Sequence, residues 1–315
     1  MARPSAASVS DFEHIRDLAV SAAARLERWP SYYERRYLEF LSYRALFPNP
    51  ELGHVLELGS GIGYQSALLA KLSNKLIATD LPDENLGDHA PGMQAAREFL
   101  ALMKVDNVEF RPCSAEKLPF QDACFDMVFS SHVLEHIPNQ QEALKEIYRV
   151  LKPGGYHFCV VPTSTEKIYA FMNFYTYLVG RLFHHLAKKV KSKYRRPLVE
   201  EQDLGSSLRK NAMSQLRYFP FPPPHGHSKH YLNELLTWTP SSWAKKVMAA
   251  APFIIEKQCT TQVNPLLSWL GAIIPKKGTA VHSMTRKFEL KIGQWPVIRS
   301  MGMNTVMICR KPLHG

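Results

Sequence analysis

The sequence has few cysteines and no long apolar run, and both absences narrow what the chain can be. Its five cysteines are widely separated and never form a C-x-x-C pair, which argues against a disulfide framework or a zinc site. No stretch stays apolar over the roughly 18 residues that a membrane-spanning helix requires. Residues 1–30 lack a basic segment followed by an apolar one, so they do not resemble a secretory signal. We therefore expect a cytoplasmic protein.

Acidic residues are scarce in one part of the chain. The formal net charge is +11, and residues 167–217 contribute much of it, with eleven Lys or Arg against three acids. A segment of this composition favours a polyanionic partner, such as an anionic membrane surface, a nucleic acid or a phosphorylated compound.

Apolar residues make up 45% of the chain, and their periodicity alternates between that of strands and that of helices. Strands are expected at 54–58, 75–79, 107–110, 125–130, 156–161, 253–259 and 305–310. Alternation at short spacing predicts an α/β fold with a doubly wound, mostly parallel seven-stranded sheet. We divide the chain into an N-terminal helical lid (1–50), an α/β core (51–162), an aromatic and basic insertion (163–224), and the rest of the core (225–315), with a second apolar insertion at 263–285.

The strongest local signal is the segment Val55–Gly63, which reads VLELGSGIG. It predicts a strand, a glycine-rich turn and then a helix, an arrangement in which a ligand can lie against bare backbone N–H groups. The spacing differs from the G-x-G-x-x-G of dinucleotide sites. Asp80 ends the next expected strand, at the position where a carboxylate can bind the two hydroxyls of a ribose.

Several further motifs follow in order, and together they resemble the class I S-adenosylmethionine-dependent methyltransferases, particularly the group of ubiquinone/menaquinone-biosynthesis methyltransferases. The resemblance covers residues 50–162 well and 225–260 and 303–311 weakly. It is carried by Glu57–Gly63, Asp80, Cys113–Phe120, Phe125-Asp126, Leu134–His136 and Leu151–Gly155.

The resemblance implies a Rossmann-like fold, S-adenosylmethionine as cofactor and S-adenosylhomocysteine as product. It places Gly59, Ser60, Gly61 and Gly63 under the methionyl and ribose parts of the cofactor, with Glu57 near the amino-acid end. Asp80 is expected to bind the ribose and Leu81 to pack on the adenine.

Four serine and alanine positions complete the cofactor site that the resemblance implies. Ser114 and Ala115 are expected at the adenine edge, and Ser130 and Ser131 near the methionyl amino group and the methyl. Ser114 departs from the family pattern, which has an acid there. We therefore expect weaker adenine recognition.

Methyl transfer is an in-line displacement for which the protein aligns the acceptor and, where required, removes a proton. His136 and His132 follow the fourth expected strand, and either is a candidate general base. A structural role for each remains open. We expect Tyr33, His227 and Tyr231 to line the acceptor pocket. No metal is required, and a zinc site at His225, His227 and His230 is disfavoured because a fourth ligand is missing.

Both insertions combine apolar and basic residues, and the family's topology implies that both emerge on the cofactor side. The first has the uncharged aromatic run 168–180 before seven Lys or Arg at 181–196, and the second has 266–274 before Lys276 and Lys277. This composition is typical of an element lying in a membrane interface. We predict a small-molecule or lipid-like acceptor and peripheral association with an anionic membrane, against the alternative of core-capping aromatics beside a solvated basic face.

Two other functions remain open. An RNA methyltransferase would use the basic insertion for phosphate contacts, although the aromatics do not interleave with the basic residues as a stacking platform requires. A non-catalytic scaffold would keep the cofactor loop and lose turnover. The sequence specifies neither the methylated atom nor the oligomeric state.

Overall fold

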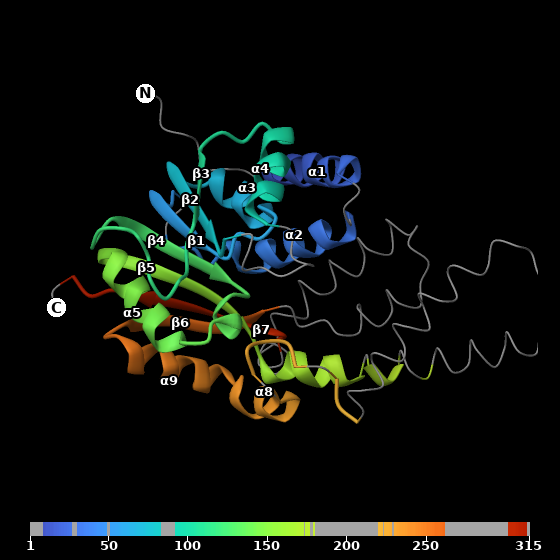
Figure 1. The fold of residues 1–315 in the computed structure, drawn as a ribbon, viewed down its shortest axis with the longest axis vertical. Helices are drawn as coiled ribbons and strands as arrows, with labels where there is room; N and C mark the ends of the chain where they lie inside the picture. Colours follow the sequence, from blue (N-terminus) through green and yellow to red (C-terminus); the bar gives the residue numbers. More distant parts are fainter. Residues whose placement is uncertain are drawn as a thin grey trace, which may run out of the picture.

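A computed structural model describes residues 9–26, 30–48, 51–82, 92–172, 174–176, 179, 220–222, 224–228, 230–261 and 302–313. The described strands form one seven-stranded sheet with helices on both faces (Figure 1). Their order is β3-β2-β1-β4-β5-β7-β6. β7 runs antiparallel to β5 and β6, and the other neighbouring pairs are parallel. This confirms the expected α/β class and the seven strands. They are β1 (His54–Leu58), β2 (Lys75–Asp80), β3 (Val108–Pro112), β4 (Phe125–Ser131), β5 (Leu151–Pro162), β6 (Ile254–Thr261) and β7 (Asn304–Arg310).

The helices divide between the two faces of the sheet (Figure 1). One face packs against α1 (Val9–Arg25), α2 (Pro30–Arg44), α3 (Tyr64–Ala70) and α4 (Met93–Leu102). The other packs against α5 (Gln140–Val150) and α9 (Pro240–Ala250), with α8 (Tyr231–Thr237) preceding α9. The apolar core is therefore split into two layers by the sheet.

Alternation along β4 shows how the strand serves both layers. Met127 and Phe129 belong to the layer under α1–α4, and Val128 belongs to the layer under α5 and α9. Successive side chains of a strand point to opposite faces. This alternation also decides which of the serines ending β4 faces the α2 side.

An aromatic cluster packs the end of α2 against the sheet. Tyr43 and Phe47 pack against Phe129 of β4 and Phe158 of β5, with ring centroids 4.5–6.4 Å apart. Tyr43, Phe129 and Phe158 are essentially fully buried. The N-terminal helices are thus part of the core.

Two segments differ from the elements expected from the sequence. β5 begins at Leu151, five residues before the strand expected at 156–161, and runs through Gly154 and Gly155. The glycines there pair with Lys311 through Gly154 N–H to Lys311 O and Lys311 N–H to Gly155 O, both 2.9 Å. Residues 164–172, at the start of the insertion expected at 163–224, are helical, and the Thr163 hydroxyl accepts the backbone N–H of Glu166 at 3.4 Å.

Most of the 163–224 insertion, and all of 263–285, lie outside the described residues. Among the described helices, none is both long enough and apolar enough to cross a membrane.

Candidate active site

A cavity of about 200 Å³ opens at the carboxyl ends of β1 and β4. The chain order of the strands reverses between these two neighbours, and open α/β sheets bind ligands outside such a switch point. The wall comes from four elements: the end of β1 with its following loop, the start of α3, the end of β4, and α2. The lining residues are Arg36, Glu57, Leu58, Gly59, Ser60, Gly61, Ile62, Tyr64, Gln65, Phe129, Ser131 and His132.

The loop after β1 depends on its glycines. Gly59 has φ +67°, and a Cβ there would lie 2.4 Å from Val133 Cγ2, so only glycine fits. Gly61 has φ +52°, and a Cβ there would meet no atom within 4 Å. Backbone at Gly61 is therefore open to a ligand.

Polar groups around this loop fit a cofactor that carries a ribose and an amino acid. The hydroxyl of Ser60 is buried and, among the described residues, has no hydrogen-bond partner. The Asp80 carboxylate accepts the backbone N–H groups of Gly61 (2.7 Å) and Leu81 (2.8 Å). It therefore lies beside the loop, at the edge of the cavity.

Glu57 is buried at the floor of the cavity. Its carboxylate accepts the Ser66 hydroxyl at 2.5 Å. Burial raises the pKa of Glu57 to about 8; the Ser66 hydrogen bond and Arg36 oppose this rise, and Asp80 adds to it. Glu57 is thus poised to ionise when a cation arrives.

Glu39 of α2 joins the N-terminal helices to the end of β4. Its carboxylate is 2.6 Å from Arg36 Nη1, and its other oxygen meets the Ser131 hydroxyl and His132 Nε2, each at 3.1 Å. Burial works to raise the pKa of Glu39, but Arg36 and His132 outweigh it and hold the pKa well below its usual range. Glu39 is therefore ionised although it is buried, and it links α2 to the end of β4.

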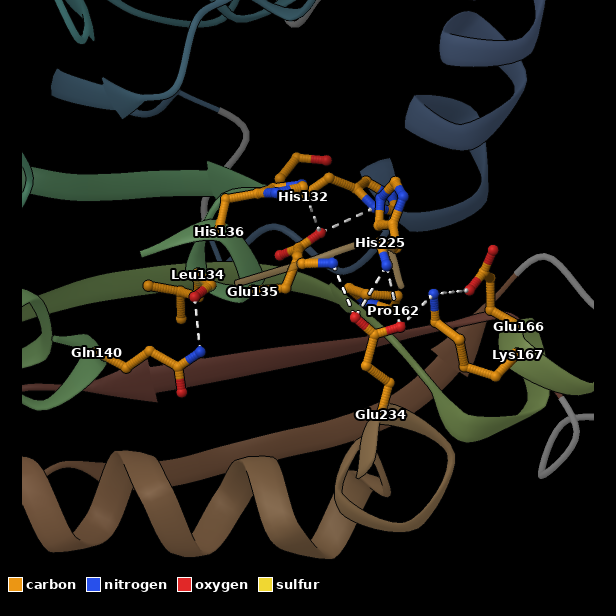
Figure 2. A network of polar contacts seen from close by, with 12 residues as sticks. His132, Leu134, Glu135, His136, Gln140, Pro162, Glu166, Lys167, His225 and Glu234 are labelled. Carbon is orange, nitrogen blue, oxygen red and sulfur yellow. Dashed lines mark hydrogen bonds and ion pairs between the residues drawn. The ribbon is translucent and has the colours of Figure 1, made fainter. Parts of the chain in front are cut away.

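His132 lies between two carboxylates. Its Nε2 is 3.1 Å from Glu39 Oε1. Its Nδ1 is 3.4 Å from Glu135 Oε1 (Figure 2). Burial acts to lower the pKa of His132, and Glu39 and Glu135 together raise it to about 9. The backbone has φ +57°, uncommon for a residue other than glycine, and it directs this ring into the cavity wall.

Six of the sixteen site residues predicted from the sequence line the cavity. Those that line the cavity are Glu57, Gly59, Ser60, Gly61, Ser131 and His132. Gly63 caps α3 with φ +80°. Asp80, Leu81, Ser114 and Ala115 are outside the lining set. The segment 83–91, which follows β2, is outside the described residues.

Ser130 does not face the cavity, contrary to the prediction. Its hydroxyl lies 2.9 Å from His157 Nε2, in the layer on the opposite side of the sheet. The cause is strand alternation, since Phe129 and Ser131 take the cavity side.

Three residues predicted to line an acceptor pocket are placed outside this cavity. Tyr33 is fully buried against the rings of Tyr64 and Phe99. Tyr231 is 5% exposed, and its hydroxyl donates to Lys167 O. His227 is exposed, and its backbone N–H donates to Glu135 O at 2.8 Å.

His136 is also outside the cavity wall. Its side chain is 47% exposed, and its ring packs against His225 with centroids 5.1 Å apart. Of the two histidines predicted as bases, His132 alone lines the cavity.

Arg36 and Glu39 are site residues that were not predicted from the sequence. Their i,i+3 spacing is a helical ion-pair signal, but nothing local showed that the pair faces β4, whose residues follow more than ninety positions later. Tyr64, Gln65 and Phe129 were also missed as lining residues.

Comparisons with known proteins agree with this geometry. Residues 56–159 match the family model described as a methyltransferase domain. The ubiquinone/menaquinone biosynthesis C-methyltransferase UbiE of Desulfotalea psychrophila is 32% identical over 146 residues, which cover 45% of this chain and 54% of that protein. The sterol 4-C-methyltransferase strm-1 of Caenorhabditis elegans is 28% identical, with 48% and 46% covered. The chain therefore spans about half the length of these curated relatives.

Among solved structures, a SAM-dependent methyltransferase from Aquifex aeolicus is 24% identical over 35% of this chain and 57% of that one, with a TM-score of 0.31. Residues 56–159 thus resemble the methyltransferase domain of class I enzymes such as UbiE, and the strand order and the loop after β1 fit such a domain. The cofactor of this class is S-adenosylmethionine.

Glu57 generates a testable prediction about stability in the absence of cofactor. A carboxyl whose folded pKa is raised favours folding below its unfolded pKa, and this contribution is lost as pH rises through the folded pKa. Between the ordinary value of 4.5 and about 8, each pH unit costs the folded wild type on the order of 1.4 kcal/mol. Glu57→Gln removes this cost.

We therefore expect the free energy of unfolding of Glu57→Gln, relative to wild type, to increase from pH 5 to pH 8 and then level off. Chemical denaturation across this range measures it. Glu51→Gln changes an exposed carboxylate just before β1 and serves as control. A pH-independent difference between Glu57→Gln and wild type would contradict the burial argument.

Proposed function

We propose that this protein transfers the methyl group of S-adenosylmethionine to a carbon atom of a small, apolar acceptor. One observation carries the proposal: Arg36 and Glu57 line the same cavity as the loop Gly59–Gly61. The amino-acid end of the cofactor carries a carboxylate and an ammonium, and a guanidinium and a carboxylate are their natural partners. The names of both relatives, a C-methyltransferase of quinone biosynthesis and a sterol C-methyltransferase, support the acceptor class.

The rest of the cofactor is proposed to extend past Gly61 towards Asp80. Asp80 would bind the ribose hydroxyls. Leu81, which is 40% exposed, would pack on the adenine. Ser114 and Ala115 follow β3, the strand next to β2, and remain proposed contacts of the adenine edge.

His132 is proposed to meet the acceptor. Bound S-adenosylmethionine would supply the electrophilic methyl group, with S-adenosylhomocysteine as the product. Glu39 and Glu135 flank the His132 ring and fix its orientation. Both carboxylates would stabilise the His132 ring after it has taken the acceptor's proton. They therefore make His132 a stronger base, and they also reduce the fraction of His132 that is neutral near pH 7.

Label transfer from methyl-labelled S-adenosylmethionine to a panel of phenols, quinols and sterols tests this proposal, with chelator present. We expect carbon-methylated product, and a fall in rate of about 100-fold or more in His132→Gln, the scale typical of a lost acid–base group. His136→Gln, one turn away and outside the cavity, is the matched control and should retain the wild-type rate. Equal losses in both variants, or no labelled product from any acceptor, would contradict it.

A membrane surface is proposed as the place where the acceptor is met. The helical segment directly after β5 exposes Ile168 (51%) and Met172 (56%), one turn apart, and Val179 further along is 49% exposed. Beneath them, Phe171 packs near Tyr231, whose ring stacks on Phe221. The basic run 181–196 follows in the sequence, and apolar side chains beside basic ones suit an anionic interface.

Flotation with vesicles of anionic and of zwitterionic lipid measures this association. We expect the protein to float with anionic vesicles at low salt, and Met172→Asp to reduce the bound fraction several-fold. Met248→Asp is the control, because Met248 on α9 is equally exposed at 54%. Absence of flotation at low salt, or the same reduction in both variants, would refute the proposal.

A further inference from the structure

We propose that Glu135, His136 and His225 form a binding site for one divalent transition-metal ion, of which Zn²⁺ is the best match. One ligand atom from each of the three side chains lies within 4.8 Å of the others. The sequence had grouped His225 with His227 and His230 and had favoured no metal. The fold instead brings His225 to a different pair, which comes from the turn after β4.

The ligand types select the metal. Two imidazoles and one carboxylate are a common protein ligand set for zinc, with ligand distances near 2.0–2.2 Å. Mg²⁺ and Ca²⁺ prefer oxygen ligands alone. Ligand atoms around a tetrahedral zinc lie about 3.4 Å apart at these distances, so the cluster must close slightly. His136 and His225 are both exposed and can make this movement, and their exposure leaves the fourth position to water.

Glu135 supplies an independent indication of a cation. Its side chain is fully buried, yet neither carboxylate oxygen has a hydrogen-bond partner among the described residues. Two imidazole nitrogens lie near it, His132 Nδ1 at 3.4 Å and His136 Nε2 at 4.0 Å. A buried carboxylate without hydrogen bonds is costly, and a metal ion bound between it and the two histidines would satisfy it.

The third ligand is held in place by a buried ion pair (Figure 2). The carboxylate of Glu234, fully buried, accepts the backbone N–H groups of His225 and Gly226 at 2.9–3.0 Å. Lys167 Nζ lies 3.0 Å from the same carboxylate. These contacts fix the backbone of the loop that carries His225.

The loop also touches the turn that carries the other two ligands. A Cβ on residue 226 would lie 2.4 Å from Glu135 O. The backbone at Gly226 is therefore so close to the backbone at Glu135 that only glycine fits at position 226. The backbone N–H of His227 donates to the same carbonyl at 2.8 Å. An ion bound here therefore links two segments that are already in contact, without a large ordering cost.

Calorimetric titration of the full chain with Zn²⁺, after removal of metal by chelator, tests the proposal. We expect one tight equivalent. Loss of a direct ligand in His136→Ala or His225→Ala should weaken binding beyond the roughly 10–100-fold that follows loss of an outer-shell partner. Glu135→Gln keeps the size of the buried side chain and should also weaken it.

His227→Ala and His230→Ala are matched controls, because both are exposed histidines of the same loop, and they should bind like wild type. Replacement of Zn²⁺ by Co²⁺ should give the visible absorption of a four- or five-coordinate ion, lost in His225→Ala. No stoichiometric binding, or equal weakening in all four histidine variants, would overturn the proposal. None of these measurements depends on methyl transfer.

Discussion

The buried carboxylate of Glu39 holds α2 in position, and α2 forms one wall of the cavity. It contacts Arg36 on its own helix and Ser131 and His132 at the end of β4. Burying a charge is expensive unless it is paired and hydrogen-bonded, and here three groups meet that requirement. Removal of Arg36 or His132 would take away a cation that balances this carboxylate, and removal of Ser131 would take away a hydrogen bond. The contact thereby fixes α2, and with it Arg36, over the loop after β1.

The opposite wall depends on backbone geometry. The loop from Gly59 to Gly63 has three glycines with positive φ, and this path lets Asp80 of the neighbouring strand receive the N–H of Gly61. Strand order places β4, with Ser131 and His132, directly beside β1. A polar cavity thus lies where the order of the strands reverses, which is the position at which open α/β sheets bind their ligands.

Much of this could be predicted from the sequence. Strands buried on both faces leave continuous apolar runs, and the glycine-rich turn after β1 has a distinctive pattern, so the sheet and the loop were expected correctly. The errors came from register and tertiary contact. Ser130 and Ser131 are adjacent and chemically identical, and only the pairing of β4 with its neighbours decides which one faces the cavity.

Partners distant in sequence were the other source of error. Glu39 and His132 are 93 positions apart, and Glu135 and His225 are about as far apart, so no local pattern reveals either pairing. Tyr33 has the helical spacing of a lining residue and the burial of a core residue. Helical periodicity in the sequence is the same for a pocket-lining residue and for a core residue. Only the packing of Tyr33 against Tyr64 and Phe99 shows that it is a core residue.

The loop after β1, with Asp80 beside it, is proposed to hold the cofactor. A thermal-shift titration with S-adenosylhomocysteine tests it most directly, comparing wild type with Asp80→Asn and with Asp106→Asn, a change at an exposed aspartate. Ligand at a hundred times Kd stabilises the folded state by roughly 2.7 kcal/mol. The account predicts a saturable rise in Tm for wild type and Asp106→Asn, and at least tenfold weaker binding for Asp80→Asn. No saturable rise in wild type, or the same affinity in Asp80→Asn, would contradict it.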